Sequence, residues 1–420
     1  MNASSKFHIS PLCVTASLLF GMAVLGASAN PMHKPSNMPL VTAESVAMSS
    51  EGLASIDKLF SDKIDAGLIQ GGVTIVARQG KVVHFSTHGK MDVDNDRAME
   101  PDTSFLMASS SKPLYAAAAM VLVDEGLIIL EEPVSKYIPE FAEVKVAIPL
   151  KSSKDIYSKG KGKISDNYRL VSTDKSVTIY HLLTHTSGIP WFSLSPLAKK
   201  GSKKGSDDLA ARVDRIASSP LVFQPGTQWG YSNDALDVIG RVIEVASGMR
   251  LDEFMSEKLF KPLEMNNTHF GLPKSKASKR MVLSGKYQKE ALEKYFESKG
   301  VVSTAEDYLH FNQMLLNEGE LFGRRVLSQE SVRKISADHV GDLFSRMDKG
   351  PTGMGFGFMV SVTLDPVAAK NSRGKGSFGW GGMGGTSSWA DPENGLVGVL
   401  MLQQEHGEGF AEAINASINR

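Results

Sequence analysis

The clearest alternation of apolar and polar positions lies near the two ends of the chain. Close to the start, apolar residues recur at the spacing of a helix, at Leu53, Ile56, Leu59, Phe60 and Ile64. Residues 71–89 then form two β-branched runs on either side of Gln79-Gly80, which is typical of a β-hairpin. The pattern therefore predicts a helix followed by a hairpin.

Towards the other end, from Phe356 onward, the pattern shortens to the period of strands. The strand-like runs are FGFMVSVTL, SFGWGG, TSSWAD and GLVGVLMLQ, and a helix is predicted in EGFAEAINASINR. Strands at both ends of a chain with helices between them favour one antiparallel sheet built from the two termini. We therefore expect an α/β (α+β) fold in which a mainly helical region is inserted.

The segment between these ends is dominated by helical patterns. Residues 109–130 give the strongest helix, with serines at the start, Pro113 in the first turn and an alanine-rich interior. Residues 134–273 have helical patterns joined by long polar connections, and the lysine-rich stretches in 151–163 and 198–208 are predicted to be solvated loops.

These patterns divide the chain into parts. We expect a flexible lead over 30–43, a sheet domain from 44–133 and 274–420, and a mainly helical domain over 134–273.

Composition narrows the class of protein. The 420 residues are 42% hydrophobic and 22% charged, which is ordinary for a globular protein with a large core and excludes a disordered or fibrous chain. Basic and acidic residues balance at 46 each, so no overall charge favours nucleic acid or a membrane surface. The expected partner is a small molecule without strong charge, and the sequence leaves the oligomeric state open.

The first 29 residues resemble a secretory signal peptide. They contain no acidic residue, one lysine at Lys6, an apolar run over 12–26 and the small residues ASA at 27–29. A membrane anchor needs about 20 apolar residues, and this run is shorter. We expect export to the periplasm or the medium, with no stable membrane insertion after cleavage. The only cysteine, Cys13, lies in this segment, so the mature chain has no disulfide or thiolate chemistry.

Ser109 and Lys112 are the first candidates for catalysis. Residues three apart share a helix face, and a lysine whose pKa is lowered by burial can remove the proton of a serine hydroxyl. Other serines also have a lysine three residues on, but only Ser109 begins a strong, buried-looking helix after an apolar run; the others are Ser55, Ser158, Ser172, Ser331 and Ser372.

Tyr231 and Asn233 are the second candidates. A tyrosine is a poor base in water, but a neighbouring ammonium such as that of Lys112 stabilises the phenolate, so Tyr231 could share proton transfer. The alternative is structural: Tyr231 packs, and Asn233 caps the helix that follows.

Two further patterns give weaker hypotheses. His181 and His185 are four residues apart, but neither a third ligand nor the usual intervening glutamate is evident, so no metal is predicted. The glycine-rich stretch 374–392 contains the spacing of a dinucleotide fingerprint, but strands rather than a helix follow it, so no nucleotide cofactor is predicted.

Six segments in fixed order carry a resemblance to a known family: FLMASSSK, TIYHLLTHTSGI, PGTQWGYSN, LFKPLEMNNTHF, GVVSTAEDYLHF and FGWGGMGGTSSWADPE. The chain resembles serine hydrolases of the β-lactamase and penicillin-binding-protein superfamily, and most closely the family VIII carboxylesterases. The resemblance extends from Ser45 to the C-terminus. It implies an antiparallel sheet flanked by helices, a helical domain beside it, and an active site in the cleft between them.

The resemblance also implies roles for individual residues. Ser109 corresponds to the acylated nucleophile, Lys112 to its proton acceptor, and Tyr231 to the general base that returns a proton to the leaving group. Asn233 would orient Lys112 or bound substrate. The amides of Ser109 and Met383 would form the oxyanion hole.

One departure from the family bears on the substrate. Class C β-lactamases have Lys-Thr-Gly where this chain has Trp380-Gly381-Gly382. Tryptophan offers an apolar face and one N–H but no cation, so uncharged acyl or alcohol groups should be preferred over anionic antibiotics. The glycines are expected to let a substrate lie against bare backbone.

Three functions are compatible with the sequence. The first is an exported serine esterase that works through an acyl-enzyme. The second is a hydrolase of amides, either a β-lactamase or a D,D-peptidase or D-aminopeptidase acting on cell-wall peptides. The third is a non-catalytic module that binds peptidoglycan or a protein, although such a module has no physical need for Lys112 and Tyr231 together.

Overall fold

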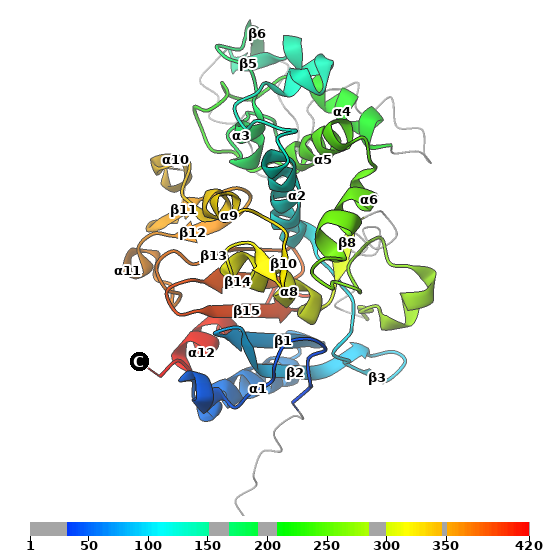
Figure 1. Cartoon of the computed structure of the whole chain (residues 1–420), viewed down its shortest axis with the longest axis vertical. Helices are drawn as coiled ribbons and strands as arrows, with labels where there is room; N and C mark the ends of the chain where they lie inside the picture. Colours follow the sequence, from blue (N-terminus) through cyan, green and yellow to red (C-terminus); the bar gives the residue numbers. More distant parts are fainter. Residues whose placement is uncertain (1–31, 151–167, 192–207, 285–299, 347–350, 420) are drawn as a thin grey trace, which may run out of the picture.

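The computed structural model describes residues 32–150, 168–191, 208–284, 300–346 and 351–419 (Figure 1). The predicted signal peptide and most of the two lysine-rich loops lie outside these ranges. No helix within them combines the length and the apolar character needed to cross a membrane.

The central element is an antiparallel sheet that joins the two ends of the chain. Its order is β11-β12-β13-β14-β15-β1-β2-β3. The strand β1 (Gly71–Arg78) lies beside the last strand, β15 (Leu396–Met401), with Val73 opposite Met401. The other strands are β2 (Lys81–Asp92), β3 (Arg97–Ala98), β11 (Met354–Phe356), β12 (Ser361–Thr363), β13 (Phe378–Gly381) and β14 (Ser387–Asp391). The prediction of one sheet built from both termini is confirmed.

Helices cover both faces of this sheet (Figure 1). Successive side chains of a strand point to opposite faces, so Ile75 packs in the core that contains α8 (Ala305–Leu316), whereas Val76 packs with α1 (Ser50–Asp65) and α12 (Phe410–Ala416). Burial of the apolar side chains between the layers drives this arrangement. The predicted N-terminal and C-terminal helices are therefore the two that share one face.

The hairpin turn has the predicted location. Gln79 and Gly80 have φ values of +52° and +72°, which suit the two central residues of a tight hairpin turn. The strand predicted in FGFMVSVTL is instead divided between β11 and β12, because the chain turns between them and Met359 has a φ of +59°.

The helix predicted over 109–130 is shorter than expected. A 3-10 turn, η2 (Ala108–Ser111), precedes α2 (Lys112–Asp124), and Pro113 lies in the first turn of α2. The helix stops before Gly126, whose φ of +72° is a left-handed conformation that glycine adopts readily after a helix.

The part of the chain between α2 and α8 is largely helical but also contains a hairpin that the sequence pattern did not indicate. Within the described residues its α-helices are α3 (Ile179–Leu183), α4 (Leu209–Ala217), α5 (Asp234–Ser247) and α6 (Leu251–Met255), with a π-helical turn, η6 (Ser256–Phe260). The hairpin pairs β5 (Lys145–Pro149) with β6 (Tyr168–Ser172). The helix α2 packs against α5, so it joins this region to the sheet. The domain boundaries given above remain a prediction.

The described ranges also contain shorter elements. A small sheet has the order β4 (Phe105–Leu106), β8 (Val301–Ser303) and β7 (His269–Phe270), and β9 (Glu320–Leu321) pairs with β10 (Arg324–Arg325). The remaining helices and turns are η1 (Ala43–Val46), η3 (Val134–Lys136), η4 (Pro139–Glu143), η7 (Lys274–Lys279), α9 (Gln329–Ser336), α10 (Asp342–Ser345) and α11 (Pro366–Ala369).

Part of the segment predicted to be a flexible lead packs along β2. The amide of His33 donates to the carbonyl of Phe85 at 2.9 Å, and the amide of Val41 donates to the carbonyl of Val82 at 3.0 Å. Residues 32–43 thus supply backbone partners to a strand near the end of the sheet.

Candidate active site

Ser109 lies in the turn that joins the sheet region to α2. The residue before it, Ala108, has a φ of +45°, a conformation that is uncommon and costly for a residue with a side chain. Such strain persists only where the surroundings hold the backbone in place. The turn is held by the hydroxyl of Tyr308, which donates to the carbonyl of Ser110.

Two further side chains fix this turn to the sheet. The amide of Leu106 donates to Oε1 of Gln403 at 2.9 Å, so Gln403 ties the residues before the turn to the end of β15. The hydroxyls of Ser110 and Thr386 are 3.0 Å apart, and Thr386 also donates to the carbonyl of Met107 at 3.3 Å. The position of Ser109 is therefore set by contacts from two segments that adjoin strands of the sheet, Thr386 just before β14 and Gln403 just after β15.

The structure brings Ser109, Lys112 and Tyr231 together. The phenol of Tyr231 donates to Oγ of Ser109 at 2.7 Å, and Nζ of Lys112 lies 3.3 Å from the same oxygen. The serine oxygen is thus within hydrogen-bond distance of two groups that can exchange protons with it. Tyr231 is far from Ser109 in sequence, and the fold alone closes this gap.

Lys112 is almost fully buried, with 2% of its surface exposed. Its Nζ donates to Oδ1 of Asn233 at 2.7 Å and lies 4.6 Å from the centre of the Tyr231 ring. Burial disfavours the charged amine and lowers the pKa of Lys112 to about 7, an effect that the negative charge of Asp237 only partly offsets. A substantial fraction of the amine is therefore neutral near pH 7 and able to accept a proton.

Tyr231 behaves differently from the expectation that a neighbouring ammonium would favour its phenolate. Burial raises the pKa of Tyr231 above its usual value of 10, and the contacts with the Ser109 hydroxyl and Trp380 oppose this only in part. The phenol is therefore protonated near neutral pH, where it can donate a proton rather than accept one.

Aromatic rings hold Tyr231 from several sides. Its ring stacks on Trp380 at a centroid distance of 5.8 Å, and Trp191 meets it edge-on at 5.5 Å. His185 lies 4.9 Å away on the buried side. Burial and the nearby Lys112 keep the pKa of His185 well below its usual range, so this ring is uncharged.

The two histidines that were weighed as metal ligands do not act together. His181 belongs to the cap of α3, where its Nδ1 accepts from the amide of Thr178 at 3.1 Å, whereas His185 packs under Tyr231. Within the described part of the chain, no three His, Cys, Asp or Glu side chains gather closely enough to hold a metal ion.

A cavity of about 490 Å³ opens above Ser109. It is lined by Ser109, Trp191, Tyr231, Ser361, Arg373, Gly379, Trp380, Gly381, Met383 and Ser387. Among the described residues, the amide of Met383 donates no hydrogen bond, which leaves it available to a ligand in the cavity. Of the predicted site residues, Lys112, Asn233 and Gly382 are absent from this lining, and Asn233 contacts the amine of Lys112.

The two glycines of the third motif, Gly381 and Gly382, differ in their surroundings. A Cβ on Gly382 would lie only 2.4 Å from the carbonyl oxygen of Met107 and 2.4 Å from Oγ1 of Thr386, whereas a Cβ on Gly381 would meet only Thr386 O, at 3.4 Å. Gly382 therefore has no side chain because the strand packs closely on the nucleophile's turn. Gly381 and Trp380 line the cavity, whereas contact between the backbone of Gly382 and a substrate remains a prediction.

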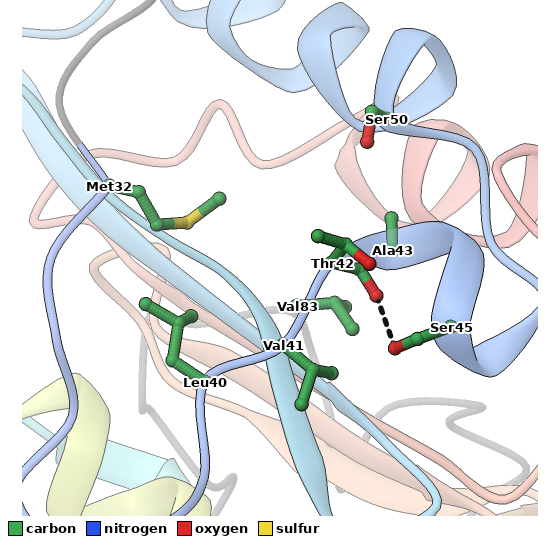
Figure 2. Close-up of a pocket in the computed structure, with 8 residues that line it drawn as sticks. All are labelled: Met32, Leu40, Val41, Thr42, Ala43, Ser45, Ser50 and Val83. Carbon is green, nitrogen blue, oxygen red and sulfur yellow. Dashed lines mark hydrogen bonds between the residues drawn. The ribbon is translucent and has the colours of Figure 1, made fainter.

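A second cavity lies elsewhere, between the N-terminal segment and β2 (Figure 2). Its volume is about 650 Å³, and its lining is mostly apolar, with Met32, Leu40, Val41 and Val83 among the residues. The hydroxyl of Ser45 donates to the carbonyl of Thr42 at 2.7 Å (Figure 2). No acid, base or cation lines this cavity, so its described surface offers no group for proton transfer.

Comparison with known proteins places this chain in a family. The family model described as Beta-lactamase matches residues 56–419. Protein Rv1367c of Mycobacterium tuberculosis is 32% identical over 365 residues, which cover 81% of this chain and 87% of that protein. Esterase EstB of Burkholderia gladioli is 29% identical over 401 residues, which cover 87% of this chain and 93% of the esterase.

A solved structure also has a similar fold. The structure of "EstCE1, a hydrolase with promiscuous acyltransferase activity" superposes with a TM-score of 0.71 at 23% identity, covering 88% of this chain and 99% of that one. The predicted resemblance, the predicted fold class and the prediction of a serine hydrolase are confirmed. The chain belongs to the β-lactamase family.

Proposed function

We propose that the protein is an exported serine esterase that cleaves carboxylic esters through an acyl-enzyme on Ser109. The observation that carries the proposal is the Ser109 oxygen, which lies 3.3 Å from the buried amine of Lys112 and 2.7 Å from the phenol of Tyr231. A serine becomes a nucleophile when a neighbouring base takes its proton, and a lysine with a pKa of about 7 is such a base at neutral pH.

Acylation then follows from the geometry. Neutral Lys112 accepts the hydroxyl proton while the Ser109 oxygen attacks the ester carbonyl, and negative charge develops on the carbonyl oxygen. The amide of Ser109 lies in the first turn of a helix, where amides have no partner within the helix, and the amide of Met383 is available in the cavity. Both amides are placed to stabilise that charge.

Tyr231 completes the proton transfer. Because its pKa is raised, the phenol is protonated when the tetrahedral intermediate collapses, so it can donate to the leaving alkoxide and recover a proton from Lys112. Water then attacks the acyl-enzyme and releases the acid. In this proposal Lys112 is the base and Tyr231 the proton donor, while Asn233 orients the amine.

The groups beside the scissile bond are proposed to be uncharged. Trp380 stacks on Tyr231 and lines the cavity together with Trp191 and Met383. Trp191 and Met383 are each about half exposed. These side chains present apolar surface next to Ser109 and no cation. The relative EstB is named an esterase, which supports the same reaction class here. The signal-peptide pattern of the first 29 residues supports export.

The proposal is tested by labelling and hydrolysis. The mature chain should react with a fluorophosphonate probe at Ser109 and hydrolyse p-nitrophenyl butyrate, and Ser109→Ala should abolish both. Ser55→Ala is a matched control, because Ser55 also has a lysine three residues on but lies exposed on α1, bonded to the carbonyl of Gly52. Full esterase activity in Ser109→Ala would exclude the mechanism. Absence of any adduct in the wild type would favour a non-catalytic binding module.

A further inference from the structure

Arg373 lines the same cavity as Ser109 but takes no part in the proposed reaction. It precedes β13, and its side chain reaches over the buried ring of Trp389, with Cζ 4.4 Å from the ring centre. Stacking on an aromatic face holds a guanidinium in place without using its N–H groups. The cation is therefore fixed beside the cavity while its donors remain free to bind something else.

The strand register shows where Arg373 lies relative to the reacting groups. On β13 and β14, Gly379 is opposite Trp389 and Trp380 is opposite Ser388. Because alternate residues face opposite sides of a sheet, Trp389 and Trp380 lie on different faces. Arg373 stacks on Trp389, and Tyr231 stacks on Trp380. One cavity touches both, so it passes around the edge of β13.

That edge is open because the neighbouring strand is short. Of the residues of β13, β12 pairs only with Phe378 and Gly379, so Trp380 and Gly381 form the free border of the sheet at this point. Gly381 has no side chain, and a Cβ there would meet nothing closer than 3.4 Å. A chain-like substituent bound to Ser109 can therefore cross the border beside Gly381 and reach the Arg373 side.

The charge of Arg373 is not neutralised by an ion pair in the described part of the chain. Glu412 and Asp391 lie near enough to raise its pKa, yet neither makes an ion pair with it, and Asp391 already accepts from the amide of Gly374 at 2.8 Å. Burial lowers the pKa of Arg373 to about 10, which still leaves it a cation at neutral pH. A half-buried guanidinium with unused donors matches a carboxylate in charge and geometry.

Two hydroxyls accompany the guanidinium in this part of the cavity. Ser361 donates to the carbonyl of Gly379 at 3.1 Å, and Ser387 lies on β14 opposite Gly381. No hydrogen bond to the Ser387 hydroxyl is found within the described ranges. Arg373 and Ser387 together thus offer several donors on one side of the cavity.

We propose that Arg373, with Ser387, forms a subsite for a carboxylate at the far end of the substrate's acyl chain. The inference rests on the proposed esterase function and refines its substrate class: the ester end is surrounded by Trp380 and other apolar groups, and the anionic end lies across the border of β13. The preferred substrates are then esters of dicarboxylic acids with one free carboxylate.

The test uses the mature protein and p-nitrophenyl monoesters of adipate, suberate and sebacate, each compared with its methyl ester, which lacks the charge. Ser109→Ala supplies the blank for spontaneous hydrolysis. We expect wild-type kcat/KM to be at least about tenfold higher for the free acid at one of these chain lengths, which corresponds to about 1.4 kcal/mol of differential binding. Arg373→Gln should reduce this ratio to about 1, and Arg373→Lys should retain part of it.

Arg325→Gln is the matched control, because Arg325 pairs with Glu320 on a distant hairpin and its loss should leave the ratio unchanged. If Arg373→Gln unfolds, Ser387→Ala decides: a lower ratio supports the subsite, and an unchanged ratio overturns it. A wild-type ratio of about 1 at every chain length, or one that Arg373→Gln does not alter, would also overturn it. Failure of the esterase proposal can be distinguished from failure of the subsite proposal, because the methyl esters would then also resist hydrolysis.

Discussion

Replacement of Lys112 by methionine should abolish esterase activity and yet stabilise the protein at neutral pH. Lys112 has a folded-state pKa of about 7, against 10.5 for an ordinary lysine. Between these values the unfolded chain holds a proton that the folded chain has released, so the contribution of Lys112 to stability rises with pH over this window. Burial of Lys112 lowers the free energy of unfolding at low pH, and this cost disappears as pH approaches 10.5.

The size of the effect follows from the pKa values. One pKa unit corresponds to about 1.4 kcal/mol, so burial of Lys112 costs folding about 4 kcal/mol at pH 7 and about 2 kcal/mol at pH 9. Lys112→Met removes this cost but leaves Oδ1 of Asn233 without its partner, a loss of about 1–3 kcal/mol. The variant should therefore be more stable than wild type by about 1–3 kcal/mol at pH 7, and this advantage should shrink by about 2 kcal/mol at pH 9.

Urea unfolding of both proteins at pH 7 and pH 9 measures the difference. Lys58→Met is the control, because Lys58 is exposed on α1 and pairs with Asp62. The stability of this variant relative to wild type should not change over this pH range.

The wild-type kcat/KM for p-nitrophenyl butyrate should rise about tenfold per pH unit below about 7 and level off above it. A stability difference for Lys112→Met that is the same at both pH values, with activity still rising at pH 10, would refute a lowered pKa.

Four other substitutions test separate parts of the site. Tyr231→Phe should fold normally and lower kcat by about 10²–10⁴, measured on p-nitrophenyl butyrate, because the proton donor to the leaving group is lost; a normal kcat would remove Tyr231 from the mechanism. Gly382→Ala should cost about 1–3 kcal/mol in a thermal melt, because its Cβ would clash with Met107 O, whereas Gly381→Ala should fold like wild type. Equal melting temperatures for the two would contradict the packing argument. Trp380→Lys should raise the ratio of cephalosporin to ester hydrolysis, and no change in that ratio would undercut the role given to Trp380.

The sheet was predictable because its signals are local. The alternation in β1 and β2 and the turn at Gln79-Gly80 can be read from adjacent residues, and the two-ended sheet follows from the order of the elements. The end of α2 and the split between β11 and β12 were missed because left-handed residues decide them. A glycine at position 126 was a readable signal, whereas the φ of Met359 is not encoded in its residue type.

The candidate site was predictable only in part. Ser109 and Lys112 are three residues apart, so their meeting follows from helix geometry. The approach of Tyr231 depends on the packing of α5 against α2; the residues alone left a structural role for Tyr231 open, and the family resemblance favoured the catalytic one. The raised pKa of Tyr231 and the lowered pKa of Lys112 depend on how deeply each is buried. Sequence spacing does not give that depth.

Arg373 was missed for a similar reason. Its role depends on which face of β14 the ring of Trp389 occupies and on where β12 ends, and both are matters of strand register. The readable signal was the alternation within TSSWAD, which places Ser387 and Trp389 on one face of the strand.

The central claim is that Ser109 serves an esterase rather than a β-lactamase. Paired hydrolysis rates of the purified mature protein on p-nitrophenyl butyrate and on a chromogenic cephalosporin, with Ser109→Ala as the blank, test it most directly. The account predicts fast, serine-dependent ester cleavage and a slow or absent lactam signal. Fast lactam hydrolysis with weak ester cleavage would contradict it, and would point to Arg373 as the cation that replaces the lysine of the third motif.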